Sequence, residues 1–333
     1  MSIFLRPTVS VALEVLRNVQ SQLTTTQNQA STGLRVTSAK DNATYWRIST
    51  LTRSDTKALS AVQDALGLAD ATVNVASTSI NQSADILSQI KAKLVTASED
   101  GVDKDKVNDD IEQLKSQLRS VAEAASFNGD NWVVLNGSDD PLKPKEIPGS
   151  FIRYANGTVS VGKLTYQTDI APSSTITSGD ARYLIDDLAN GTGGHGIFTS
   201  TAFAIEAGAG KDYVLLASKA GDTTGQVEIS LDANTSSGAI KDMLTVVNAM
   251  MDQLTEVGSA FGSMEKRVQL QESFAQDLSD SLTSGVGKLV DADMEEVSTR
   301  LLALQTQQQI GLQGLSIANA SYDTVRQLFQ SIH

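Results

Sequence analysis

Few residues in this chain have the type and spacing that catalysis or metal binding requires. The sequence contains two histidines, His195 and His333, and no cysteine. Without cysteine there is no disulfide, thiolate metal site or cysteine nucleophile. One internal histidine without an HExxH motif does not supply the ligands of a zinc site. A Ser–His–Asp arrangement through His195 stays open by counting alone, with no motif to support it. We therefore expect no catalytic residue, no bound metal and no cofactor.

One glycine-rich segment matches the pattern of a phosphate-binding loop. Residues 191–196 read Gly-Thr-Gly-Gly-His-Gly, which fits G-x-G-x-x-G. That motif binds dinucleotides when it follows a strand and opens a helix. Here a helical segment precedes the glycines and a strand is expected after them, so the order is reversed. We interpret the segment as a surface loop.

Composition excludes several classes of partner. The 333 residues include 26 basic and 39 acidic side chains, for a net charge of −13. This balance argues against nucleic acid and anionic membranes as partners. The first residues lack the basic and apolar regions of a cleavable signal peptide, and no apolar run is long enough to span a membrane. Residues 1–57 are locally basic, which we interpret as a solvated helix face.

The distribution of glycine and proline indicates which elements must carry the function. Of 24 glycines, 15 lie between Gly129 and Gly238, and every proline except Pro7 lies between Pro141 and Pro172. Because these residues break helices, their scarcity toward both ends predicts long helices there and irregular or β structure between them.

Both ends of the chain carry apolar residues at the heptad spacing of packed helices. From Val9 to Leu34 the heptad positions step by four and three residues and are apolar except for Gln20 and Gln27. From Val297 to Phe329 the same spacing recurs, with Gln308 and Gly311 among the apolar residues. This spacing places them along one seam of a helix that packs on another helix. The sequence therefore predicts a coiled pair of the two ends, whose seam we assign to Val9, Leu13, Leu16, Leu23, Leu34, Val297, Leu301, Leu304, Leu315, Val325 and Phe329.

Further apolar residues lie beside these seams. They are Val11, Val15 and Val19 near the N-terminus, and Leu302, Ile310, Ile317 and Leu328 near the C-terminus. A two-helix pair cannot cover them, so we expect neighbouring copies of the chain to do so.

Between the ends we predict three more long helices, one short helix and several short strands. A Ser38–Asp41 capping box indicates a helix start near residue 40, continuing to about residue 100. Further helices are expected over 104–125 and 239–284, the last ended by Gly285 and Gly287. Asn156-Gly157 predicts a β hairpin. We also expect strands near 132–135, 198–205, 213–217 and 226–231, and a short helix over 181–188.

Several ordered motifs resemble those of bacterial flagellins. They are the segment 29–43 (QASTGLRVTSAKDNA), Ser126-Phe-Asn-Gly129, the segment 289–308 and Leu315-Ser-Ile-Ala-Asn-Ala320 before Leu328-Phe329. The resemblance covers about residues 9–135 and 240–330. Within the family, the chain resembles the compact flagellins of alphaproteobacteria. It implies a structural, non-enzymatic subunit that polymerises with itself into the helical flagellar filament.

The resemblance also implies a route and a set of partners. Such subunits leave the cell unfolded through the flagellar type III apparatus, so the expected location is the extracellular flagellum. Expected partners are an export chaperone, the filament cap and the hook-junction proteins. Two alternatives stay open: a hook–filament junction protein, or a surface carbohydrate-binding protein on a flagellin scaffold with residues 173–236 as the binder.

Together these observations predict a mainly α fold with a smaller β-containing part. Both chain ends form a long-helix coiled-coil bundle, with an inserted α+β outer domain. We expect an inner coiled coil from 1–36 and 286–333, a helical bundle with β hairpins from 37–172 and 237–285, and a variable outer domain from 173–236. Because some flagellins carry O-linked sugars there, Ser173, Ser174 and Thr175 are candidate glycosylation residues.

Overall fold

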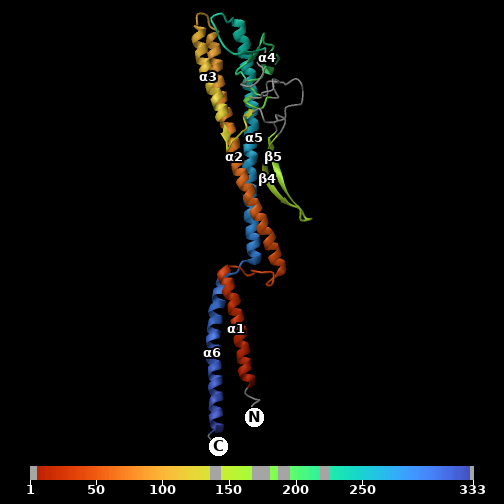
Figure 1. The fold of residues 1–333 in the computed structure, drawn as a ribbon, viewed down its shortest axis with the longest axis vertical. Coiled ribbons are helices and arrows are strands. Elements are labelled where there is room, and N and C mark those ends of the chain that lie inside the picture. The colour runs from red at the N-terminus through yellow and green to blue at the C-terminus, as the bar shows by residue number, and fades with distance from the viewer. Residues whose placement is uncertain (1–5, 136–143, 167–180, 187–195, 218–224, 331–333) are drawn as a thin grey trace. The chain divides into compact units, whose positions relative to one another are not determined.

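The computed structural model describes residues 6–135, 144–166, 181–186, 196–217 and 225–330. The chain divides into two compact units: the terminal unit, made of residues 1–57 and 278–333, and the central unit, made of residues 58–277. Figure 1 shows the fold. The predicted mainly α class with a small β part is confirmed.

The described residues form six α helices and eight short strands. The helices are α1 (Arg6–Thr32), α2 (Ala43–Ala97), α3 (Lys104–Ala124), α4 (Ala202–Glu206), α5 (Ser237–Val290) and α6 (Met294–Gln330). The strands are β1 (Ser126–Phe127), β2 (Asp130–Asn131), β3 (Val134–Leu135), β4 (Lys145–Arg153), β5 (Val159–Tyr166), β6 (Ile185–Asp186), β7 (Asp212–Val214) and β8 (Gln226–Glu228).

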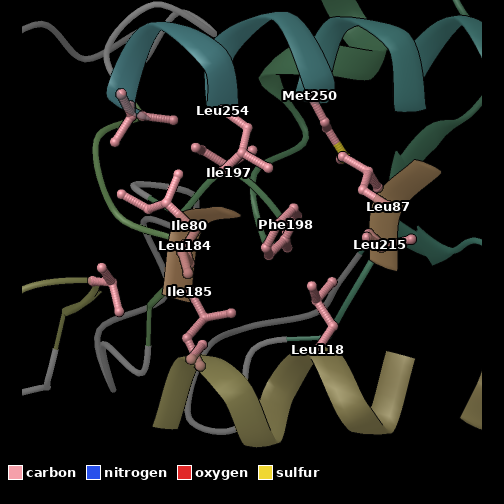
Figure 2. Close-up of a cluster of buried hydrophobic side chains, with 14 of the residues drawn as sticks. Ile80, Leu87, Leu118, Leu184, Ile185, Ile197, Phe198, Leu215, Met250 and Leu254 are labelled. Atoms are coloured by element: carbon pink, nitrogen blue, oxygen red, sulfur yellow. The ribbon is translucent and has the colours of Figure 1, made fainter. Parts of the chain in front are cut away.

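The hydrophobic core of the central unit lies between α2, α3 and α5. Figure 2 shows Phe198 surrounded by side chains from all three helices, including Leu87 of α2, Leu118 of α3 and Met250 of α5. Phe198 is fully buried. The predicted apolar faces of α3 and α5 point into this core, because their residues recur every three or four positions and so share one side of each helix.

The predicted hairpin is confirmed in β4 and β5, which pair antiparallel around Asn156 and Gly157. Gly157 has φ of +86°, a conformation that glycine adopts without steric cost. The Asn156 side-chain oxygen accepts hydrogen bonds from both the backbone N–H and the hydroxyl of Thr158, which fixes the turn. Three further two-stranded pairs, β1–β2, β3–β6 and β7–β8, complete the β part.

A row of polar side chains on α3 binds the backbone that follows β7. Lys104 donates to the Thr235 carbonyl (2.6 Å), and Arg119 donates to the Ala217 carbonyl (2.6 Å). Between them, buried Lys115 donates to the Ile229 carbonyl (3.1 Å) and pairs with the carboxylates of Glu112 and Glu228. These bonds hold the segment around β8 against the helical layer.

Two expectations for the middle of the chain are wrong. Over 181–188 a helix was predicted, but the described part contains the strand β6, which pairs in parallel with β3. Residues 198–205 were expected as a strand, but α4 begins at Ala202. Both segments are buried on nearly all sides, so their apolar residues show no period that distinguishes a helix from a strand.

Two expected helix boundaries also differ. α5 continues through Gly285 and Gly287 to Val290, because Val286 and Val290 are buried with Val36 and their packing outweighs the low helix propensity of glycine. The first turn of α2 is capped by Asn42, whose side-chain oxygen accepts from the amides of residues 44 and 45. The predicted capping box at residues 38–41 forms a separate turn.

Candidate self-assembly surface

The helices α1 and α6 lie side by side in antiparallel orientation (Figure 1). α1 ends at Gly33, which has φ of +68° and whose carbonyl accepts from the Ala292 amide (2.9 Å) just before α6. The Arg35 amide donates to the Val290 carbonyl (2.7 Å), and its guanidinium donates to the Leu289 carbonyl (2.9 Å). The Gly33 bond joins the residue after α1 to the segment that leads into α6, and the two Arg35 bonds join the chain after α1 to the last turn of α5.

The inward face of α6 consists of the residues predicted for its seam. Val297 and Leu304 are buried, and Leu301 and Leu315 are half-buried. The other residues of the first four turns are mostly exposed. The alternating steps of four and three residues therefore describe the side of α6 that faces α1.

The inward face of α1 differs in part from the predicted seam. Leu16 is half-buried and Leu23 is buried, as are the corresponding predicted positions of α6, and Leu34 is half-buried beyond the helix end. Leu13, however, is 39% exposed. Val19, which was placed off the seam, is half-buried.

Small and polar residues explain this difference. Ala12 is half-buried and Thr26 is buried, each one position before a residue of the predicted run. The residues of α1 that face α6 are therefore Ala12, Leu16, Val19, Leu23, Thr26 and Ala30. They also recur every three or four positions, but from Leu16 onward each step of three comes where the predicted seam has a step of four. The apolar periodicity favoured Leu13 over Ala12, because a pattern of large apolar residues does not reveal that a small side chain can also lie in a close contact.

One close approach within the pair depends on glycine. A Cβ added at Gly311 would lie 2.9 Å from Cδ1 of Leu16, which is closer than carbon atoms pack. One turn away, the Gln308 side-chain amide donates to the Gln20 side-chain oxygen (2.6 Å). The glutamines that dilute both apolar runs thus contribute a polar contact to the pair. A glycine at a seam position was the sequence signal for this approach.

An apolar stripe remains on the outer side of α6. Ile310 and Ile317 are seven residues apart, so they lie on the same side of the helix, and they are 62% and 67% exposed. Leu302 is 65% exposed, and Leu312, which the sequence reading did not single out, is also exposed. Val11 and Val15 are exposed on α1. We call Leu302, Ile310 and Ile317 the outer stripe.

The turn between α1 and α2 is organised by one carboxylate. Asp41 accepts hydrogen bonds from the amides and hydroxyls of both Thr37 and Ser38, at 2.9–3.1 Å. The Thr37 hydroxyl and these further donors stabilise the charged form and lower the pKa of Asp41 below its ordinary value of 3.8. The acidic start of α6 is capped in a similar way, by Asp293 accepting from the amide of Glu295 (3.0 Å).

Several predicted residues cannot be placed in this surface. The side chains of Val9, Val325, Phe329 and Leu328 lie outside the described part of the structure. The candidate glycosylation residues Ser173, Ser174 and Thr175 also lie outside it, as does His195 with the rest of the glycine-rich segment before Gly196.

The central unit has an exposed apolar surface of its own, on the β4–β5 hairpin. Phe151 is half-buried, and the Arg153 guanidinium lies 6.0 Å from its ring centroid. Near the turn, Val159 and Val161 are opposite Arg153 and Phe151, so they share one face of the hairpin with Phe151, and both are more than 50% exposed; Ile152 is exposed on the other face. Exposed apolar side chains that share one face are typical of surfaces that contact another protein.

The described residues offer little to a metal or a membrane. Within the ranges that the structure covers, no group of three or more histidine, aspartate or glutamate side chains is arranged to hold an ion. Among the helices described, none is both long enough and apolar enough to cross a bilayer.

Comparisons with known proteins agree at both ends and along the whole chain. A family model of the bacterial flagellin N-terminal helical region matches residues 8–138, and one of the C-terminal helical region matches residues 244–329. Flagellin C of Rhizobium meliloti (strain 1021) is 44% identical over 329 residues, covering 99% of each chain. Flagellin A of Rhizobium meliloti is 38% identical over 99% of this chain and 100% of its own length. A flagellin of Brucella melitensis is 35% identical over 99% of each chain.

Proposed function

This chain belongs to the bacterial flagellins and is a structural subunit of the flagellar filament, and from this we propose that its terminal unit assembles through two separate surfaces. The first is the predicted seam, which joins α1 to α6 within one copy. The second is the outer stripe of α6, which joins one copy to the next. The observation that carries the proposal is the exposure of the outer stripe, which α1 does not cover.

The energetic argument concerns the three residues of the outer stripe. Fully burying an aliphatic side chain contributes about 1.5–3 kcal/mol. Leu302, Ile310 and Ile317 are each more than 60% exposed in the single chain, so most of that free energy is still available to a contact between copies. A contact repeated head to tail without closing produces an open helical filament, so the same stripe would be used along its whole length.

The terminal unit is expected to gain its order from assembly. Fixing a residue costs about 1–2 kcal/mol of backbone entropy, and isolated helices are marginal in water. The apolar side chains buried along one narrow seam between two helices offset little of this entropy cost. We therefore propose that α1 and α6 are largely unfolded in the free subunit and become ordered in the filament.

The remaining parts of the proposal concern export and location. The subunit leaves the cell unfolded through the flagellar type III apparatus without a cleavable signal peptide, with a chaperone, the filament cap and hook-junction proteins as partners. The inner coiled coil, helical bundle and outer domain keep the boundaries 1–36 with 286–333, 37–172 with 237–285, and 173–236. Ser173, Ser174 and Thr175 are proposed as glycosylation residues of the outer domain.

No observation favours the two alternatives. Full-length relatives are named flagellins, which agrees with a filament subunit rather than with a junction protein or a carbohydrate-binding homologue. Negative-stain microscopy of purified protein seeded with filament fragments tests this directly. A filament subunit elongates the seeds, and failure to elongate would contradict the function itself.

The outer stripe is tested in the same assay with a matched pair of variants. Ile310→Asp places a charge within the stripe, and Gln307→Asp places the same charge at an exposed position three residues earlier, which does not share a seven-residue spacing with any member of the stripe. We expect Ile310→Asp to stop elongation and Gln307→Asp to retain most of it. Equal loss in both variants would show that any added charge blocks assembly, and equal retention would show that the outer stripe is not a contact.

A further inference from the structure

The central unit contains a small cavity that combines two cationic side chains with an unpaired hydroxyl. The cavity has a volume of about 230 Å³ and lies between the end of β5, Arg182 and the middle of α5. Its polar lining comes from Thr165, Tyr166, Arg182, Ser263 and Arg267. These residues come from three separate segments of the chain, so no local sequence motif marks the site.

Tyr166 is the most constrained of these groups. Only 5% of the residue is exposed, and its ring packs against Phe261 (centroids 4.5 Å apart) and Trp132 (6.1 Å). Its hydroxyl oxygen is buried and has no hydrogen-bond partner. Buried polar groups are nearly always paired, so the orphaned hydroxyl of this cavity-lining residue indicates a missing partner.

The hydroxyl is available as a donor at every physiological pH. Burial raises the pKa of Tyr166 far above its ordinary value, and the nearby charge of Arg182 opposes this only in part. The group therefore remains protonated. A protonated hydroxyl offers one O–H to an acceptor in the cavity.

The charge of the cavity favours an anionic acceptor. The Arg182 guanidinium pairs with one Glu256 carboxylate oxygen at 3.3 Å, which leaves further N–H groups unused. Arg267 is exposed and makes no ion pair within the described part of the chain. Two guanidiniums against one carboxylate leave a positive excess, in a chain whose net charge is −13.

We propose that this cavity binds a small oxyanion of the size of phosphate or sulfate, held by Arg182, Arg267 and the Tyr166 hydroxyl. Guanidinium groups bind phosphate and carboxylate oxygens through two parallel hydrogen bonds, and charge-assisted bonds of this kind are the strong ones. The Tyr166 hydroxyl then gains the partner that it lacks. Thr165 adds a hydroxyl at the edge of the site, whereas the Ser263 hydroxyl already donates to the Ala260 carbonyl (2.8 Å). The inference concerns the central unit alone and does not depend on how filaments assemble.

The test measures binding of inorganic phosphate to the full-length chain in its unassembled form. Equilibrium dialysis is carried out at a constant ionic strength maintained with sodium chloride, and the fluorescence of Trp132 follows the same titration because its ring stacks on Tyr166. We expect saturable binding at one site per chain. Arg267→Gln and Tyr166→Phe should each weaken it at least about tenfold, the loss of one charge-assisted bond.

The matched control removes the same charge from the neighbouring residue. Lys266 is exposed on α5 and does not line the cavity, so Lys266→Gln should leave phosphate binding unchanged. Tyr166→Phe keeps the ring and its contacts, and its thermal midpoint without phosphate establishes that the fold is intact. Non-saturable binding, or equal weakening by Lys266→Gln and Arg267→Gln, would overturn the proposal.

A second arm identifies the source of the oxyanion. If the site serves a free ion, assembled filaments bind phosphate as tightly as the unassembled chain does. If a carboxylate of a neighbouring copy fills the site, filaments lose phosphate binding while the unassembled chain retains it. Filaments and free chain that both fail to bind would exclude an oxyanion site.

Discussion

The two units of this flagellin bury their apolar side chains to very different extents. The central unit has a continuous core in which Phe198, Phe203 and Phe261 are fully enclosed. In the described part of the terminal unit the buried apolar residues are few: Leu23, Val36, Val286, Val290, Val297 and Leu304. Large apolar residues of α6 instead face outward. The difference teaches that one unit is stabilised by its own core, whereas the other needs surface from another copy.

The largest expected effect concerns the core of the central unit. Phe261→Ala removes a ring that packs on Tyr166 and Trp132 and should lower the free energy of unfolding by about 3–5 kcal/mol. Denaturant unfolding of the free chain, followed by near-ultraviolet circular dichroism, measures this loss. Phe274→Ala is the control on the same helix, since Phe274 is 58% exposed and its truncation should cost less than about 0.5 kcal/mol. Similar losses in both variants would contradict the assigned core.

The next effect should separate assembly from folding. Leu301→Asp places a carboxylate on the inward face of α6. We expect it to reduce the free energy of association by about 3 kcal/mol, which corresponds to roughly 100-fold weaker association. The unfolding of the central unit should not change, because Leu301 is not part of it. Sedimentation of filaments gives the critical concentration, and circular dichroism gives the unfolding curve. Leu16→Asp tests the facing helix in the same way, and an unchanged critical concentration in either variant would show that the predicted seam is wrong.

A smaller effect is expected where α3 binds the segment around β8. Lys115→Met keeps the buried side-chain stem but removes the bond to the Ile229 carbonyl. We expect a loss of about 1–2 kcal/mol, since Glu112 and Glu228 are partly exposed and can turn toward water. Hydrogen exchange of the nearby Leu231 amide, which donates to Asn108, should become faster.

The control for this variant is an exposed ion pair on the same helix. Lys106 contacts Asp103 at 3.4 Å with most of its side chain in water, so Lys106→Met should leave both the unfolding free energy and the Leu231 amide unchanged. If Lys115→Met behaves in the same way, the buried lysine does not hold β8 in place.

The smallest effect is a pH dependence of the turn between α1 and α2. The pKa of Asp41 is lowered in the folded turn, so its contribution to stability is complete above its unfolded value of 3.8 and is lost as the pH falls through the folded value. The amide resonances of Thr37 and Ser38 should therefore be constant from pH 7 to about 5 and shift only in stronger acid. In Asp41→Asn the same resonances should not titrate, and a transition near neutral pH in the unmodified chain would refute this assignment.

Regular periodicity predicted the long helices well. α3 ends within one residue of its predicted boundary, and Val297, Leu301, Leu304 and Leu315 of the predicted α6 seam are buried or half-buried. Such segments bury one side only, so their apolar residues report which side that is. The strand β6 carried no such signal, because Ile185 and Asp186 point to opposite faces and are both buried, and its partner β3 is about fifty residues away.

The assembly surface was predictable only where large apolar side chains define it. Ala12 and Thr26 contribute to the contact face of α1 by being small or by tolerating burial, which spacing rules for apolar residues do not detect. The cavity around Tyr166 was not predictable, because Arg182 and Arg267 are 85 positions apart and meet only in the folded central unit. A single sequence does not specify such a convergence of distant segments.

The hydrogen bond between Gln20 and Gln308 joins positions 288 residues apart in the chain. During synthesis, α1 is therefore made near the start and its partner helix α6 near the end. Closing so long a loop is slow compared with forming the local contacts of the central unit. The order of events is thus built into the topology: the core of the central unit needs the chain only as far as Val268, whereas the helix pair needs α6 and is the last element that can form.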